Sequence, residues 1–401
     1  MAAFILVARP LLFQPKCDDF PFTTFDFTEP RLGSIAIGAD MMSHIDTRYE
    51  PRDILASTEP RRGDPLLDPI RSARVLQNAS TDAGWLVHEV RAVDAVNERA
   101  EKRQTFRFHV RARRAGAPLG DVTWYGHHYR AGEGERLLPV LRFLRAAAAP
   151  EIRVPLPIGY SRDQRLLLLP AVEGRPLSGV LEDPIESRVA ASLKRLGRAL
   201  ASFHAIRQPG PSARSSERPS FGRWDAASEA LALEDVEKRI LGAGIDAKTA
   251  DRLREGAASL RAELADDGGV SRSPSMVHRQ LHPGHVIFSA EGISMIDLDE
   301  AAFGEPEHDL GTLIAHMILG DLRRGGGARL APARADALRA GYLGGGVLRP
   351  NRLAVYTSAA LLRLALPEKT KNGGVAAPDW SRLTAVLVEE ALPDAALTSA
   401  P

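Results

Sequence analysis

Three polar motifs lie close together in the second half of the chain, and their side chains can do chemistry. They read VHRQLHPGHVI at 277–287, MIDLD at 295–299 and GEPEHDL at 304–310. Carboxylates bind hard metal ions, and histidines bind softer ones or exchange protons near neutral pH. The segment 277–299 is therefore the first candidate for a functional site.

The histidines of the first motif allow two interpretations. His278, His282 and His285 could converge with Asp297 on a transition-metal ion, because loop histidines three and four residues apart can meet. They could instead be structural or face a substrate. Asp297 likewise is either a metal ligand facing an open site or a carboxylate that hydrogen-bonds the local backbone.

The composition excludes several classes of protein. The 401 residues include 52 Lys+Arg and 51 Asp+Glu, so the formal net charge is +1. The chain therefore lacks the excess of positive charge that is typical of proteins that bind nucleic acid or an anionic membrane. The single cysteine, Cys17, can form neither an internal disulfide nor a thiolate zinc site, which predicts a cytoplasmic location. No apolar run approaches the roughly 18 residues that span a bilayer, so no membrane segment is expected.

The first part of the chain changes from irregular to periodic. Residues 1–70 are rich in Pro, Asp and Phe without a sustained period, and we expect them to form an irregular N-terminal arm. In Phe106, Phe108 and Val110 apolar side chains alternate with polar ones, which indicates a half-buried strand. A second strand is expected to begin at Val122 and to pair with the first as a hairpin.

The same region continues with one helix and two more strands. Leucines at three- and four-residue spacing predict the helix at about 133–149. The strands are expected at 154–160 and 165–170. Residues 71–173 therefore predict a small antiparallel sheet lobe with one helix.

The remainder, 174–401, predicts a larger and mostly helical lobe. A helix is expected at 189–206, and two or three more at 225–265. The polar motifs interrupt this pattern with a loop and a short hairpin around Glu291-Gly292, and helices return from Asp309.

Together the three motifs resemble the aminoglycoside phosphotransferase and choline kinase-like family. That family shows H-x-D-x-H-P-x-N-hydrophobic, then hydrophobic-I-D-hydrophobic-(D/E), then G-x-P-x-x-D-L, and the resemblance extends more weakly over about 85–390. It implies an α+β, bilobed protein-kinase-like fold in which 277–299 takes the place of the catalytic loop. His278 and Asp309 are then expected to support this polar loop.

Phosphoryl transfer in such a site needs a lysine on the ATP phosphates, Mg²⁺ held by an Asp and an Asn, and an Asp that accepts the hydroxyl proton of the acceptor. The resemblance places Gln280 at the position of the base and His285 at that of the metal-binding Asn. His127, within Tyr125-Gly126-His127-His128-Tyr129, falls at the lysine position. Asp297 remains as a carboxylate that faces the metal or the phosphates.

Each of the three substitutions weakens its expected role. The amide of Gln280 cannot take a proton, and loss of a general base commonly costs about 10²–10⁴ in rate. The imidazole of His285 suits Zn, Cu or Ni better than Mg²⁺. His127, with an ordinary pKa of about 6.5, is mostly neutral at pH 7. No lysine occurs from 103 to 193, and Lys102 precedes the strand that would need it.

We therefore expect a pseudokinase, with absent or reduced ATP-dependent phosphotransfer and a binding or regulatory role that can involve a protein partner. The alternative is an active ATP-dependent phosphotransferase acting on a hydroxyl of a small molecule, in which Gln280 orients the hydroxyl and Asp297 holds a metal. Both hypotheses allow a nucleotide or other small molecule in a cleft between the lobes. An active kinase is expected to bind ATP with Mg²⁺, whereas a pseudokinase is expected to bind ATP weakly or not at all.

Two further features allow a structural and a functional interpretation. One strand face carries His109 and a row of arginines, Arg103, Arg107, Arg111 and Arg113. This row could hold an anionic partner, although a solvated sheet face is the usual explanation. Glu135 could be the helix carboxylate that pairs with the lysine in the family, but with His127 at that position a solvated helix face is favoured.

Overall fold

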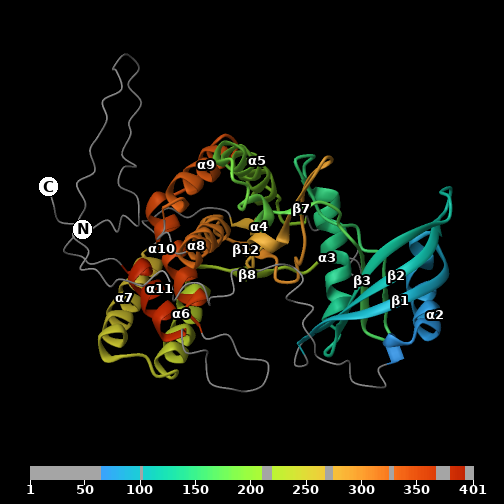
Figure 1. Ribbon diagram of the computed structural model, residues 1–401, viewed down its shortest axis with the longest axis horizontal. Coiled ribbons are helices and arrows are strands. Elements are labelled where there is room, and N and C mark those ends of the chain that lie inside the picture. Colours follow the sequence, from blue (N-terminus) through green and yellow to red (C-terminus); the bar gives the residue numbers. More distant parts are fainter. Residues whose placement is uncertain are drawn as a thin grey trace, which may run out of the picture.

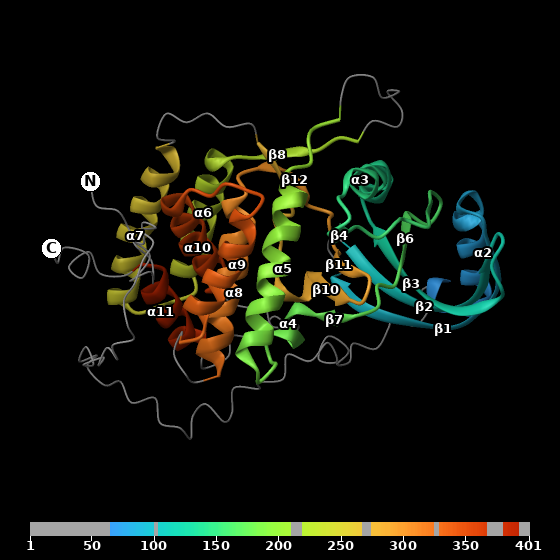
Figure 2. The same cartoon turned by 90° about the horizontal axis from the view of Figure 1, so that it is seen from above.

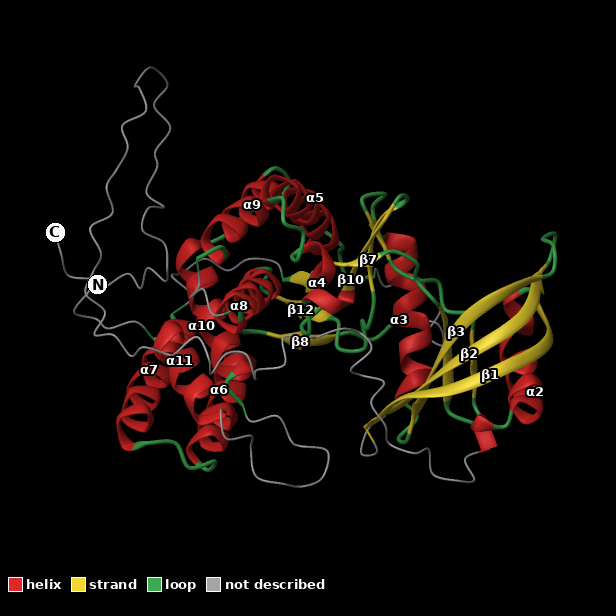
Figure 3. Cartoon of the chain, viewed as in Figure 1, coloured by secondary structure: helices red, strands yellow, loops and turns green. Residues whose placement is uncertain are grey.

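Two lobes lie next to one another, a small one built on a twisted sheet and a larger one made mostly of helices (Figures 1 and 3). This computed structural model describes residues 65–99, 103–209, 219–266, 274–324, 329–366 and 380–392. The predicted α+β bilobed fold is confirmed. Nearly all of the predicted arm, 1–64, lies outside the described residues, as does Lys102.

The small lobe contains an antiparallel sheet of five strands. In spatial order they are β1 (Trp85–Arg99), β2 (Arg103–Arg114), β3 (Gly120–Tyr129), β6 (Leu166–Pro170) and β5 (Gly159–Ser161). The predicted alternation holds in β2, where Phe106, Phe108 and Val110 are buried. The predicted hairpin is the β2–β3 pair.

Helices cover both faces of this sheet, whereas the sequence predicted only one. Leu167 of β6 packs in the same hydrophobic cluster as α3 (Glu133–Ala147), while its neighbours Leu166 and Leu168 pack in the cluster of α2 (Pro69–Ser80). Since alternate residues of a strand face opposite sides, α2 and α3 lie on opposite faces. Figure 2 shows α2 at the far end of the small lobe. Two 3₁₀ turns, η2 (Pro65–Leu67) and η3 (Thr81–Ala83), flank α2.

The predicted strand over 154–160 is wrong. The structure has β4 (Ile152–Arg153) before this range and β5 at its end, with no strand between them. Pro155 and Pro157 lack the backbone N–H that a strand ladder requires, and this explains the interruption.

A second sheet joins the two lobes, in the order β4-β11-β10-β7. Its centre is the hairpin of β10 (Val286–Ser289) and β11 (Gly292–Met295), which confirms the predicted hairpin around Glu291-Gly292. β4 pairs with β11, and β7 (Arg175–Pro176) pairs with β10. The polar segment 277–299 therefore lies where the lobes meet.

The helical lobe buries most of the core. Its helices in the described residues are α4 (Leu177–Val180), α5 (Glu186–His204), α6 (Ala226–Leu241), α7 (Ala247–Ala265), α8 (Glu307–Arg323), α9 (Ala331–Leu343), α10 (Pro350–Leu364) and α11 (Trp380–Ala391). A three-stranded sheet, β8 (Gly222–Trp224), β12 (Ala302–Gly304) and β9 (Ser275–Val277), adjoins them. The short turn η4 (Pro283–His285) precedes β10. No helix in the described ranges has the length and apolar character needed to cross a bilayer.

Helices α5 and α9 touch through their backbones. A Cβ added at Gly341 of α9 would lie 2.1 Å from the carbonyl oxygen of Lys194 in α5, and one added at Gly197 would lie 2.2 Å from that of Leu338. Real side chains do not approach a backbone so closely, so the glycine pair sets the separation of these two helices.

Gly341→Ala is expected to lower the free energy of unfolding by about 1–3 kcal/mol, because the helices must move apart to admit the methyl group. Urea unfolding measures the change. The matched control is Gly320→Ala in α8, where the nearest atoms lie at an ordinary 3.7 Å; there alanine is expected to be neutral or to stabilise by up to about 1 kcal/mol. Equal effects of the two substitutions would contradict this account.

Candidate functional site

One buried carboxylate fixes the backbone of the polar loop between β9 and β10 through hydrogen bonds. Asp309, in the first turn of α8, accepts hydrogen bonds from the backbone N–H of His278 at 2.7 Å and from that of Arg279 at 2.9 Å. Asp309 and His278 are fully buried. The side chain of His278 contributes a further bond from its Nε2 to the carbonyl oxygen of Ile296, at 2.9 Å.

Two buried histidines in turn support Asp309. His204, at the end of α5, places its Nε2 3.1 Å from Oδ2 of Asp309, and His308 places its Nδ1 3.6 Å from Oδ1. Burial alone would raise the pKa of Asp309, but its hydrogen bond with His204 and the nearby ring of His308 lower that pKa well below the usual range. Asp309 therefore remains an anion that can accept from the loop.

Asp297 lies directly after β11 and adopts a left-handed backbone conformation, with φ of 59°. Arg279, in the polar loop, has φ of 70°. Non-glycine residues rarely occupy this region, and it costs of order 1 kcal/mol or more when they do. Arg279 and Asp297 both lie in the segment 277–299, where these unusual backbone conformations set the directions of the two polar side chains.

A guanidinium group from the small lobe bridges the two carboxylates of the second motif. Arg103, the first residue of β2, places Nη1 2.6 Å from Asp297 Oδ1 and 2.6 Å from Asp299 Oδ2, and its Nη2 donates to Asp297 Oδ2 at 3.2 Å. Burial alone would raise the pKa of Asp297, but the hydrogen bond and charge of Arg103 lower it well below the usual range. The pKa of Arg103 is raised in return, against the effect of its own burial.

Tyr129 and His127 of β3 complete the small-lobe side of this cluster. Arg103 pairs in register with Tyr129, whose hydroxyl donates to Asp299 Oδ2. His127 is buried, with Nδ1 3.4 Å from the Tyr129 hydroxyl. Burial, and then the charge of Arg103, lowers the pKa of His127 below its ordinary value of 6.5. His127 is therefore a neutral imidazole at pH 7, and the positive charge of the cluster belongs to Arg103.

His285 lies between the polar loop and Asp297. Its Nδ1 donates to the backbone carbonyl of Gln280 at 2.9 Å, and its Nε2 lies 3.4 Å from Asp297 Oδ2. Burial and the neighbouring rings of His282 and His278 lower the pKa of His285 to about 3. Because a carbonyl only accepts, Nδ1 carries the proton and Nε2 presents a lone pair to Asp297. Gln280 itself is exposed.

The loop histidines do not converge on a common point. The rings of His278 and His285 are stacked, with centroids 5.4 Å apart and planes at 13°, and those of His282 and His285 are 3.6 Å apart. Imidazole lone pairs lie in the ring plane, so stacked rings direct them past one another. Among the described residues, no three or more His, Cys, Asp or Glu side chains are grouped so as to hold a metal ion.

The arginine row predicted on one strand face divides into different environments. Arg103 points to the other lobe and pairs with Asp297, which corrects its placement on a solvated face. Arg107 and His109 both contact Asp94 Oδ2, at 2.8 and 3.3 Å. Arg111 and Arg113 are exposed. Glu135 pairs with Arg162 at 2.8 Å, on the exposed face of α3 that was expected for it.

The sequence analysis missed Arg103 and Tyr129 as site residues. Arg103 is separated from Asp297 by 194 positions, and no local pattern reports an ion pair between lobes. Asp299 is the last residue of the MIDLD motif, so that motif pointed to it. The YGHHY pattern at 125–129 brought His127 to attention, and Tyr129 stands two residues later on the same strand face.

The buried histidines predict a stability maximum near pH 6.5. Burial would lower the pKa of His308, but Asp309 and Glu229 raise it, so its stabilising charge is present below about 6.5 and is lost as the pH rises through the raised value. Burial lowers the pKa of His285 and of His316 to about 3. The stability of the folded protein therefore falls as the pH drops below about 6.5, because the unfolded chain takes up these two protons first.

Urea unfolding measured from about pH 5 to pH 9 tests this expectation. In His308→Gln the decline of stability on the alkaline side is expected to disappear, while the decline on the acid side remains. Identical alkaline slopes for the wild type and the variant would show that His308 does not titrate as described.

A family model described as "Phosphotransferase enzyme family" (APH) matches residues 98–350. No curated protein matches the chain significantly.

Solved structures of low sequence identity share the fold. The GDP and kanamycin complex of APH(2")-IIia gives a TM-score of 0.52 at 16% identity, covering 80% of this chain and 98% of that chain. A choline/ethanolamine kinase family protein from Mesorhizobium loti gives 0.51 at 13% identity, covering 82% and 95%. A thermostable mutant of aminoglycoside phosphotransferase APH(4)-Ia, in its apo form, gives 0.51 at 15% identity, covering 76% and 94%.

Proposed function

The chain belongs to the phosphotransferase enzyme family, as its three motifs predicted, and within that family we propose that it is a pseudokinase. In this proposal ATP-dependent phosphotransfer is absent or much reduced. The protein binds a nucleotide or another small phosphorylated molecule between its lobes, and it acts by binding or by regulating a partner protein.

The observation that carries the proposal is the contact of Arg103 with both carboxylates of the MIDLD motif. Kinase-like sites use such a carboxylate to hold Mg²⁺. Here one guanidinium occupies an oxygen of Asp297 and an oxygen of Asp299 and balances one of their two negative charges, and His285 beside Asp297 offers a nitrogen ligand. Mg²⁺ prefers an octahedron of oxygens, so the residues present do not fit Mg²⁺.

The other two altered positions support the same conclusion. Gln280 has an amide where a hydroxyl proton would need an acceptor. His127 is buried and neutral, so it gives no fixed charge to a phosphate. Arg103 is a cation beside His127, at the position of the missing lysine, and a guanidinium binds phosphate oxygens well. A nucleotide phosphate is therefore expected to compete with Asp297 and Asp299 for Arg103.

A nucleotide is a reasonable ligand to test first, because the relative APH(2")-IIia was solved with GDP. Isothermal titration with ATP, ADP and GDP, each with and without Mg²⁺, measures whether the metal contributes. We expect affinities that differ by less than about threefold between the two conditions, and no release of phosphate above background. Binding that is tenfold tighter with Mg²⁺, together with steady turnover, would overturn the proposal.

The alternative is an active phosphotransferase, and the retained carboxylate of Asp297 together with the exposed side chain of Gln280 favours it. In this mechanism Gln280 orients the acceptor hydroxyl, which loses its proton late, as a loose transition state permits. Asp297 is then essential. Turnover of a small-molecule acceptor that is abolished by Asp297→Ala would support this alternative, and turnover unaffected by that substitution would eliminate it.

A further inference from the structure

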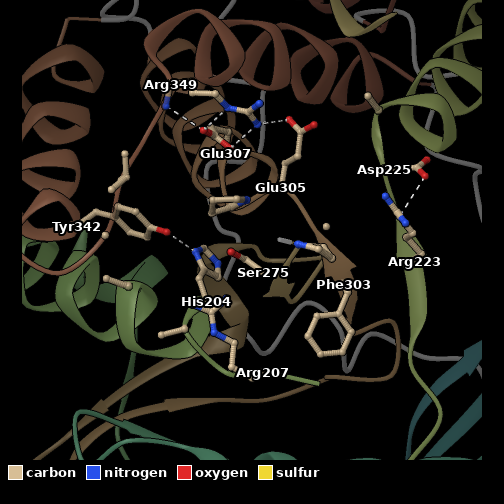
Figure 4. Close-up of a pocket in the computed structure, with 18 of the residues that line it drawn as sticks. His204, Arg207, Arg223, Asp225, Ser275, Phe303, Glu305, Glu307, Tyr342 and Arg349 are labelled. Atoms are coloured by element: carbon tan, nitrogen blue, oxygen red, sulfur yellow. Dashed lines mark hydrogen bonds and ion pairs between the residues drawn. The ribbon is translucent and has the colours of Figure 1, made fainter. Parts of the chain in front are cut away.

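A cavity of about 610 Å³ opens in the helical lobe, separate from the residues around Asp297 (Figure 4). It lies between the end of α5, the start of α6, the sheet of β8, β12 and β9, and the chain that joins α9 to α10. Its volume is in the range of pockets that hold small organic molecules, about 300–1,000 Å³. Neither Arg103 nor Asp297 lines it.

The acidic groups of this cavity already accept hydrogen bonds from arginines or from a backbone N–H. Glu307 accepts from the backbone N–H and the side chain of Arg349, at 2.9 and 3.2 Å. Glu305 accepts from Arg349 at 2.7 Å and from Arg352 at 2.7 Å. Asp225 accepts from the backbone N–H of Ser228 at 3.0 Å, which caps α6. None of these carboxylates is left to attract a cation.

Two arginines of the cavity keep donors available. Arg207, just after α5, is exposed and forms no ion pair or hydrogen bond with the part of the chain that the structure describes. Arg223 of β8 has one contact, from Nε to Asp225 Oδ2 at 3.4 Å, and its side chain is 71% exposed. Figure 4 shows the two residues on either side of Phe303. These two side chains therefore offer guanidinium donors to a ligand, and guanidinium groups suit carboxylates and phosphates.

The rest of the wall can accept an apolar body. Phe303 lines the cavity, and small residues on the surrounding helices leave the space open. They are Ala201 and Ala205 at the end of α5 and Ala226 and Ala227 at the start of α6. An inorganic ion would fill little of the volume, whereas an organic anion would bury apolar surface as well.

We propose that this cavity is a second ligand site, which binds a small organic anion through Arg207 and Arg223. The shared chemistry of the ligand is one carboxylate or phosphate group on an apolar body of about the size of an aromatic ring. The site goes beyond the proposed function, because it uses none of the residues that face the other lobe.

Calorimetric titration of the full chain with benzoate, phenyl phosphate and inorganic phosphate at low ionic strength tests the site. Benzoate or phenyl phosphate is expected to bind saturably with one ligand per chain, and comparison of the two distinguishes a carboxylate from a phosphate ligand. Arg207→Ala is expected to weaken binding about tenfold or more, as loss of a charge-assisted hydrogen bond does. Arg198→Ala, an exposed arginine of α5 that does not line the cavity, is the matched control and should bind as the wild type does.

Three outcomes would overturn the proposal. Equal affinities for Arg207→Ala and Arg198→Ala would show that the cavity is not the site. Inorganic phosphate binding as tightly as phenyl phosphate would show that no apolar body is recognised. Displacement of the probe by saturating ADP, or its loss in Asp297→Asn, would place the ligand between the lobes instead. Failure of nucleotide binding alone would leave this site standing and would refute only the proposed function.

Discussion

Arg103→Ala is expected to lower the free energy of unfolding at pH 7 by about 3–5 kcal/mol, because it leaves two partly buried carboxylates without their cation. In the wild type one guanidinium nitrogen lies 2.6 Å from Asp297 and 2.6 Å from Asp299. A cation that takes its place finds two carboxylate ligands, and carboxylates suit Mn²⁺. We therefore also expect Mn²⁺ to bind the variant at least tenfold more tightly than the wild type.

Calorimetric titration with Mn²⁺ and urea unfolding with and without the metal measure both effects. Mn²⁺ should restore part of the lost stability, since it binds the folded state. Arg107→Ala is the control on the same strand, because its partner Asp94 is more exposed and such a pair contributes about 0–1 kcal/mol. If the two variants lose equal stability, or if Asp297→Asn leaves the gained Mn²⁺ binding intact, the bridging role of Arg103 is wrong.

Asp309→Ala is expected to cost about 3–5 kcal/mol and to disorder the polar loop, because the buried carboxylate has several partners at once. The backbone N–H groups of His278 and Arg279 would lose their acceptor, and His204 would lose its bond as well. Urea unfolding gives the energy. Hydrogen exchange over the loop reports its local opening, and we expect faster exchange there than in the wild type.

Asp336→Ala is the matched control for this experiment. Asp336 is an exposed aspartate of α9 that pairs with Arg339 at 3.4 Å, and its removal should change stability by less than about 0.5 kcal/mol. If Asp309→Ala lost no more stability than Asp336→Ala, the carboxylate beneath the loop would not support it as described.

The sequence predicted correctly those strands and turns whose residue pattern lies within a short stretch of the chain. The spacing of apolar side chains in Phe106, Phe108 and Val110 predicted β2, and the Glu291-Gly292 turn predicted the hairpin of β10 and β11. The motif segments were long enough to show the family and therefore the bilobed fold. Helix α2 was missed because it follows a stretch of irregular composition and covers the sheet from the opposite face to α3.

The site was less predictable because its decisive contact joins distant parts of the chain. The motifs named Asp297, His285 and Gln280, and the structure places His285 beside Asp297. Only the register of β2 against β3, together with the packing of one lobe on the other, brings Arg103 to the same carboxylates. The catalytic and binding roles of these residues stay predictions, and the experiments above address them.

The sheet that joins the lobes limits how they can move relative to one another. β4, just after α3, is hydrogen-bonded to one edge of the β10–β11 hairpin, and β7, just after the small sheet, is bonded to the other edge. The hairpin is thus hydrogen-bonded to backbone strands at both of its edges. The pairing of β4 with β11 also holds the chain just after α3 against the helical lobe. An outward rotation of the small sheet would bend the chain next to β4 and β7. It would move Arg103 away from Asp297, while His285 and Asp297 would keep their positions next to the hairpin.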